Sequence, residues 1–148
     1  MPTRKIDPIV LRRWAIQALQ AIIHPLQVAG DFDNAVAVFR RNETTGKLSF
    51  VEVERDGVDG VDGLAGSESV AISPDGRNVY VTGDVEHALA VFRRDETTGA
   101  LSFVETQRAG VGGVDGLAKV NSVTVSPDGQ HIYAAGWADN AVAVFGQH

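Results

Sequence analysis

The chain has 148 residues, enough for one domain with a sizeable core, and its 44% hydrophobic and 22% charged residues are typical of a globular protein. It contains no cysteine, which excludes a disulfide framework and a thiolate metal site. The formal net charge is −6, and residues 25–148 alone carry −9, from 9 basic and 18 acidic side chains. Phosphate backbones would repel such an acidic region, so nucleic acid is not expected as a partner.

Residues 1–24 are predicted to form a separate amphipathic α-helix. Asp7 can cap this helix, Pro8 suits its first turn, and Pro25 ends the apolar pattern. An integral membrane span is not expected, because about 16 helical residues reach only ~24 Å. The basic start and the apolar run also fit a secretory signal. The alternative to a secretory signal is an amphipathic helix that packs on the rest of the chain or on another chain, and we favour this packed helix.

Residues 25–148 form a repeat region of about 2.3 copies. Residues 33–85 and 86–138 share 32 identities in 53 positions, without insertion or deletion. Phe39, Phe92 and Phe145 occupy one repeat position, and Tyr80 and Tyr133 occupy another. Similarity at a fixed period of this length is typical of stacked supersecondary units.

One repeat is predicted to contain four β-strands, at Glu68–Ser73, Asn78–Thr82, Ala88–Arg93 and Leu101–Arg108. The first two strands are joined by Ser-Pro-Asp-Gly, which has proline at the second turn position and glycine at the last, as tight hairpins do. Asp-Glu-Thr-Thr-Gly joins the last two strands in the same manner. The link to the next repeat, residues 56–66, is longer and rich in glycine.

The predicted strands are apolar on both faces. In Asn78–Thr82, for example, Val79 and Val81 point to one face of the sheet and Tyr80 to the other. A four-stranded antiparallel sheet that is buried on both faces must lie between similar sheets, as the blades of a β-propeller do. The predicted fold is therefore all-β, with propeller blades of four antiparallel strands.

The chain supplies only two to three blades, whereas propellers close with about 4–8. The last blade is predicted to lack its outer strand, and Leu48–Arg55 of a second copy could complete it, so that self-association closes a ring. Three chains would then give about six blades, and four would give about eight. The alternative is a fragment of a larger propeller, with the N-terminal helix over the open face of the first sheet.

The run SVAISPDGRNVYVTG, followed by HALAVFRRDETTGALSFVE, resembles the YVTN-type repeats of bacterial β-propellers grouped with the lactonase (6-phosphogluconolactonase-like) propellers. The resemblance covers about residues 26–148. It implies a propeller, a periplasmic or extracellular location, and lactone hydrolysis among the possible activities. No residue matches a lactonase catalytic motif, so no catalytic residue is assigned.

Ligands of propellers usually bind where loops gather around the central axis, and the repeat is broken most clearly in the loops between the second and third strands. Asp84, His87, Trp137 and Asp139 are therefore the ligand-binding candidates. His87 and Asp84 could act as an acid/base pair, and Trp137 could stack on a sugar ring. Neutral drift of surface loops would explain the same substitutions.

Asp56, Asp59 and Asp62 lie at short spacing in the glycine-rich link, as calcium ligands can. The second copy of the link keeps only Asp115, and no terminal glutamate of an EF-hand is present. The glycines then serve to turn the chain, so no metal or cofactor is expected. The histidines also lack the spacing of a zinc site.

These observations favour a non-enzymatic propeller module that serves in binding or assembly and completes its ring by self-association. A lactonase-type hydrolase is the first alternative. A ring that binds glycans or small molecules through repeated loop sites is the second. The residues themselves do not fix the cellular compartment.

Overall fold

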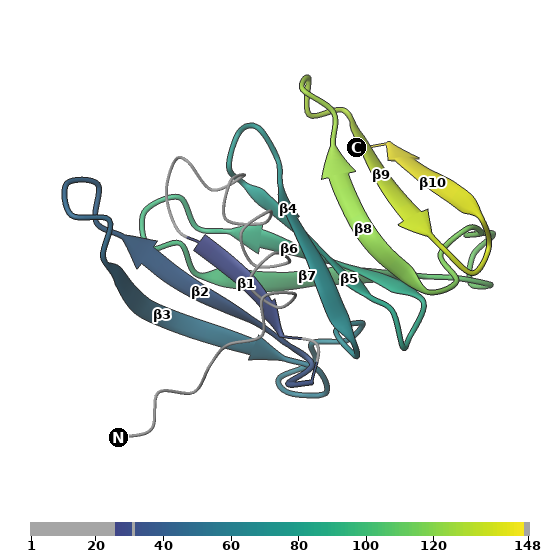
Figure 1. Cartoon of the computed structure of the whole chain (residues 1–148), viewed down its shortest axis with the longest axis horizontal. Helices are drawn as coiled ribbons and strands as arrows, with labels where there is room; N and C mark the ends of the chain where they lie inside the picture. The colour runs from purple at the N-terminus through teal and green to yellow at the C-terminus, as the bar shows by residue number, and fades with distance from the viewer. Residues whose placement is uncertain (1–25, 31, 147–148) are drawn as a thin grey trace, which may run out of the picture.

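A computed structural model describes residues 26–30 and 32–146, in which every element of regular secondary structure is a β-strand (Figure 1). The strands form three antiparallel sheets that lie side by side. The first sheet contains β1 (Leu26–Gly30), β2 (Ala35–Arg41) and β3 (Leu48–Arg55). The second contains β4 (Ser67–Ile72), β5 (Asn78–Gly83), β6 (Ala88–Arg94) and β7 (Leu101–Arg108). The third contains β8 (Val120–Val125), β9 (His131–Gly136) and β10 (Ala141–Gly146).

The all-β prediction and the division of the repeat into four strands are confirmed, and each strand boundary lies within one residue of its predicted place. In the second sheet the strands follow one another in chain order, each antiparallel to its neighbour, as in a propeller blade. The helix predicted over residues 1–24 lies outside the described residues. Within those residues, no helix has the length and apolar character needed to cross a membrane.

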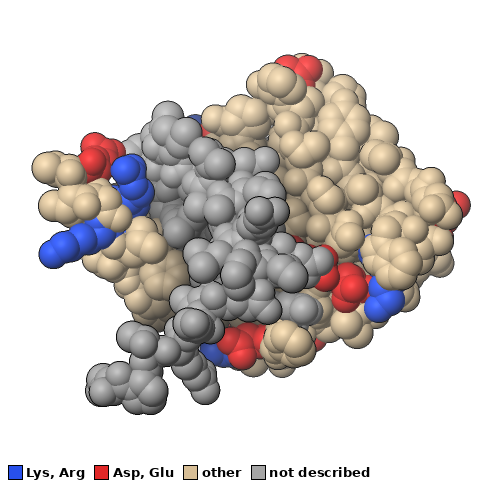
Figure 2. Space-filling view, in the orientation of Figure 1, with Lys and Arg blue, Asp and Glu red and all other residues tan. Residues whose placement is uncertain are grey.

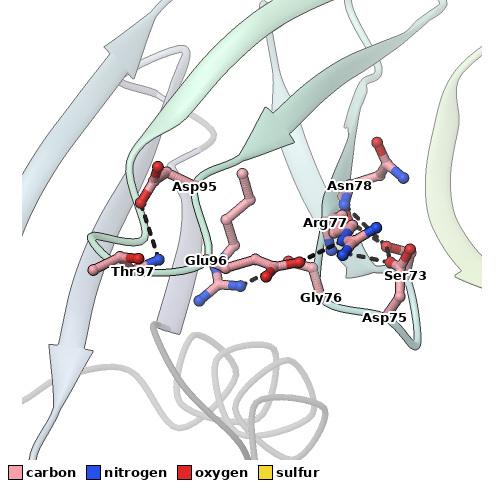
Figure 3. Close-up of polar contacts among 9 residues, drawn as sticks. Ser73, Asp75, Gly76, Arg77, Asn78, Asp95, Glu96 and Thr97 are labelled. Atoms are coloured by element: carbon pink, nitrogen blue, oxygen red, sulfur yellow. Dashed lines mark hydrogen bonds and ion pairs between the residues drawn. The ribbon is translucent and has the colours of Figure 1, made fainter.

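Short polar hairpins connect the strands at one end of the sheets, which we call the hairpin end (residues 42–47, 73–77, 95–100 and 126–130). In the β4–β5 hairpin, the Ser73 hydroxyl donates to Asp75 and accepts from the Asn78 amide (Figure 3). The hydroxyl hydrogen bond is the main reason that the pKa of Asp75 lies below its ordinary value. Gly76 has a φ of 74°, a left-handed conformation that favours glycine. The Ser-Pro-Asp-Gly motif thus fixes the hairpin through its own side chains.

The β6–β7 hairpin is capped by Asp95, whose carboxylate accepts from the amides of Thr97 (3.0 Å) and Thr98 (2.7 Å). Asn42 caps the β2–β3 hairpin with the same pattern, at the same repeat position. This capping places β3 directly beside β2. The prediction that Leu48–Arg55 completes the last sheet of another copy is therefore wrong, because this strand already serves as the outer strand of its own sheet.

Apolar side chains fill the two spaces between the three sheets. Val36 and Val38 of the first sheet pack with Val79, Val81 and Phe92 of the second. On the opposite face of the second sheet, Tyr80 and Leu89 pack with residues of the third, among them Ile132, Ala134 and Ala143. Phe92 is fully buried and Tyr80 is 4% exposed. The prediction that the complete blade is buried on both faces is confirmed.

The outer face of the third sheet differs from the same face of the second, although the repeat residues are alike. Tyr133 is 37% exposed, whereas its repeat equivalent Tyr80 is 4% exposed. Val142 is 61% exposed, whereas its equivalent Leu89 is 1% exposed. The surface seen over β8–β10 in Figure 2 also carries few charged side chains. The third sheet thus presents to solvent a face that the second sheet buries.

Candidate functional site

The opposite end of the sheets, which we call the loop end, consists of the inter-repeat links (residues 56–66 and 109–119) and the loops at 84–87 and 137–140. Backbone hydrogen bonds tie each loop to the link that precedes its own sheet. The Asp84 amide donates to the Gly66 carbonyl (3.1 Å), and the Trp137 amide donates to the Lys119 carbonyl (3.4 Å). All four predicted ligand-binding candidates lie at this end.

His87 connects the second sheet to the link that leads into the third. Its backbone is left-handed, with a φ of 55°, and its Nδ1 accepts a hydrogen bond from the Lys119 amide (3.0 Å). Asn34 occupies the same repeat position with a φ of 49°, and its Oδ1 accepts from the Gly66 amide (2.9 Å), one repeat before Lys119. His87 therefore makes the same contact between neighbouring sheets that an asparagine makes one repeat earlier.

The predicted acid/base pair of Asp84 and His87 is not formed as a direct contact. The Asp84 carboxylate instead lies 3.8 Å from Nζ of Lys119, the residue whose backbone amide is bound by His87. Because the Nδ1 lone pair of His87 already accepts a hydrogen bond, that nitrogen does not serve as a proton acceptor for a ligand. Both residues position the second link.

Asp139 and Trp137 differ in their surroundings. The Asp139 carboxylate accepts from the Ala118 amide (2.8 Å), just as Glu86 accepts from the Ala65 amide (3.3 Å) one repeat earlier. Asp139 thus holds its own link in place. The Trp137 side chain is 61% exposed, so its ring is accessible to a ligand or to another protein surface.

The acidic residues of the first link take part in an ion network that the sequence did not reveal. Carboxylate oxygens of Asp56, Asp62 and Glu86 lie within 4.8 Å of one another. Arg108 donates to Asp62 (3.1 Å) and to Glu86 (3.1 Å), and the bond to Asp62 is the main cause that raises the pKa of Arg108. Asp59 is not in this group. A guanidinium shared by two of the carboxylates favours a structural network over a metal site.

Sequence reasoning missed Glu86 and Arg108 because neither residue belongs to the aspartate run. A signal was nevertheless present, since Arg55 and Arg108 share one repeat position and Asp33 and Glu86 share another. Recurrence of a charged residue at a strand end could therefore have pointed to the structural role that Arg108 and Glu86 have. The network links the first inter-repeat segment to the second sheet, because Asp62 precedes β4 and Arg108 ends β7.

We expect His87→Asn to leave the free energy of unfolding within about 0.5 kcal/mol of the wild type, because asparagine tolerates a left-handed backbone and supplies the same kind of acceptor. His87→Val should cost about 2 kcal/mol, since a β-branched residue is strained at this φ and offers no acceptor. Urea unfolding followed by circular dichroism measures both. Equal losses in the two variants would contradict a role for His87 as a contact between sheets.

Comparison with known proteins shows to which family this architecture belongs. The model of the family "Lactonase, 7-bladed beta-propeller" matches residues 61–147. The chain belongs to this family. The resemblance inferred from the repeat residues is thereby confirmed. No curated protein matches the sequence.

Solved structures show the same fold. The chain superposes on the Pseudomonas aeruginosa periplasmic gluconolactonase PpgL with a TM-score of 0.70 and 24% identity. The superposition covers 87% of this chain and 34% of PpgL. A putative 6-phosphogluconolactonase from Bacteroides fragilis gives a TM-score of 0.68 and 24% identity, over 82% of this chain and 31% of that one. A putative 6-phosphogluconolactonase from Bacteroides uniformis gives a TM-score of 0.66 and 21% identity, over 82% of this chain and 32% of that one. The lactonase-family chain thus spans about a third of the length of these propellers.

Proposed function

We propose that this lactonase-family chain is an assembly module, which completes a propeller by associating with a second copy through the outer face of β8–β10. The exposed Tyr133 and Val142 carry the proposal. Their equivalents Tyr80 and Leu89 are buried by a neighbouring sheet. An apolar face that is covered in one repeat and open in the next is suited to a partner with the same surface as that neighbour.

The interface between the second and third sheets serves as the template for this association. There, Leu89 packs in one cluster with Ala143, and Phe145 lies against that cluster. Ala37 and Phe39 hold the same repeat positions in the first sheet and are only partly buried. The first sheet of a second copy therefore offers to Val142 the kind of residues that the third sheet offers to Leu89.

The number of sheets favours a dimer. Each chain contributes three sheets, so two copies supply six, within the range of about 4–8 blades in which propellers close. Three copies would supply nine sheets. In a dimer with a two-fold axis, the last sheet of each chain meets the first sheet of the other, and the outer face of β8–β10 is covered in both chains at once.

Light scattering during gel filtration tests the proposal. The wild-type chain is expected to elute with twice the mass of one chain, and Val142→Asp with the mass of one chain, because a charge buried in an apolar interface is strongly unfavourable. Val111→Asp is the matched control, since Val111 is also exposed but lies in a link at the loop end. A wild-type monomer at high micromolar concentration would refute the self-association proposal.

Lactone hydrolysis by the completed ring is the second candidate function. Membership of the lactonase family and the likeness to a gluconolactonase support it. The rate of gluconolactone opening should then exceed the spontaneous rate for the dimer and fall to the spontaneous rate for Val142→Asp. A dimer without activity would remove this candidate and leave the assembly proposal standing.

A further inference from the structure

Two adjoining cavities at the hairpin end, which together we call the groove, gather arginine side chains. The larger is lined by the second sheet alone, and the smaller lies between the first and second sheets. One cavity of about 460 Å³ is lined by Arg77, Arg93 and Arg94, among others. An adjoining cavity of about 200 Å³ is lined by Arg40, Arg41 and again Arg94. Arg94 thus lies where the two cavities meet. The groove lies at the opposite end of the strands from the loop end.

Arg94 is the most deeply placed of these residues. It is 8% exposed, and its Nη1 donates to the Gly76 carbonyl (2.6 Å). Its Nε is buried and has no hydrogen-bond partner within residues 26–30 and 32–146. Burial lowers the pKa of Arg94 from its ordinary value. A buried guanidinium with an unused donor is costly unless an acceptor, best an anion, reaches it.

The acidic residues that line the groove do not supply this acceptor. Glu96 is engaged in an ion pair with Arg77 (Figure 3). The Asp95 carboxylate accepts from the amides of Thr97 and Thr98, and Glu43 has contacts of its own. Five arginines and three acidic residues line the two cavities, which leaves a charge of +2.

The remaining arginines are also placed to receive an anion. Arg40 reaches across from the first sheet to the second, with its Nη2 3.4 Å from the Thr97 carbonyl oxygen. That bond has a neutral acceptor, and among the described residues Arg40 forms no ion pair. Arg41 and Arg93 are exposed at the ends of β2 and β6, and in the described part of the chain neither forms an ion pair.

We infer that this groove is a binding site for a phosphate group, with Arg94 common to both cavities, Arg41 lining the smaller cavity and Arg93 lining the larger. The planar guanidinium donates parallel N–H groups that match the oxygens of phosphate. The site depends on the juxtaposition of two Arg-Arg pairs, Arg40-Arg41 and Arg93-Arg94, from neighbouring repeats. It goes beyond the proposed assembly function, because it lies within one chain and involves neither the outer face of β8–β10 nor the loop end.

An NMR titration of the ¹⁵N-labelled full chain tests this site, with inorganic phosphate as the probe and chloride at equal ionic strength as the reference. Saturable shifts are expected at the amides of residues 40–43 and 94–99. Arg41→Gln and Arg93→Gln should each weaken binding about tenfold, the effect of losing a charge-assisted hydrogen bond. Arg55→Gln, which removes a charge at the far end of β3, should leave the affinity unchanged.

Further titrations identify the ligand and guard against a folding artefact. Glycerol 1-phosphate and glycerol distinguish a phosphomonoester from free phosphate: binding of the former supports an esterified ligand, and binding of inorganic phosphate alone supports the free ion. Arg94→Lys keeps the charge without the planar fork and should also bind more weakly while retaining the wild-type circular dichroism spectrum. Non-saturable shifts, or equal weakening by Arg55→Gln, would overturn the site. Phosphate binding by the Val142→Asp monomer would show that the site is independent of assembly.

Discussion

Tyr80→Ala is expected to lower the free energy of unfolding by about 3 kcal/mol, the range for removing a large aromatic side chain from a packed core. Tyr80 is 4% exposed and belongs to the cluster that joins the second and third sheets, together with Leu89 and Ile132. Its removal would leave a cavity between the two sheets, which could close only if the sheets moved towards each other. Urea unfolding, followed by circular dichroism and by tryptophan fluorescence, measures the loss.

Tyr133→Ala is the matched control, because it makes the same substitution at the same repeat position. In the Val142→Asp background, where the outer face of β8–β10 stays open, we expect it to cost less than about 1 kcal/mol. If the wild type self-associates as proposed, the substitution should instead weaken the dimer. Equal losses for Tyr80→Ala and Tyr133→Ala in the monomeric background would contradict the difference in burial between the two sheets.

Gly83→Ala is expected to destabilise the chain by about 3 kcal/mol or to prevent folding, because the added methyl group would meet backbone rather than a side chain that can move. A Cβ at Gly83 would lie 2.3 Å from the Gly63 carbonyl oxygen and 3.1 Å from that of Ala65. Gly83 ends β5 where the first inter-repeat link crosses it. Thermal unfolding and the yield of soluble protein report the effect.

Gly30→Ala provides the comparison at the same repeat position in the first sheet. A Cβ there would have its nearest contact at 3.4 Å, with the Cβ of Asp33, which is an ordinary van der Waals distance. We therefore expect a change within about 0.5 kcal/mol. A loss at Gly30 as large as that at Gly83 would mean that glycine is required for backbone conformation and not for the close approach of the link.

The strands could be predicted from the sequence because local chemistry and the burial pattern agree. Ser73, Asp75 and Gly76 fix their hairpin without help from distant residues. Alternating apolar residues such as Val79 and Tyr80 showed that both faces of the blade are buried. In contrast, the prediction that Leu48–Arg55 completes the last sheet of another copy failed, because the short β2–β3 hairpin with its Asn42 cap holds β3 to its own sheet.

The roles of the candidate site residues could not be predicted in the same way, because they depend on contacts across 20 or more positions. Nothing near His87 in the sequence indicates that it meets Lys119, and nothing near Asp139 indicates that it meets Ala118. Differences between repeats suggested a ligand site, yet His87 and Asn34 perform the same structural task with different side chains. A departure from a repeat therefore indicates altered function only where the contact also changes.

The hydrogen bond between Asn34 or His87 and the following inter-repeat link bears on how repeats could have been added to this protein during evolution. Each unit brings both the acceptor that holds the following link and the link that the preceding unit holds. Duplication of one whole unit of 53 residues would thus add a blade without requiring any compensating substitution, whereas a gain or loss of another length would leave an acceptor facing the wrong amide. Uniform spacing between the copies is then a condition for folding, and not merely a trace of recent ancestry.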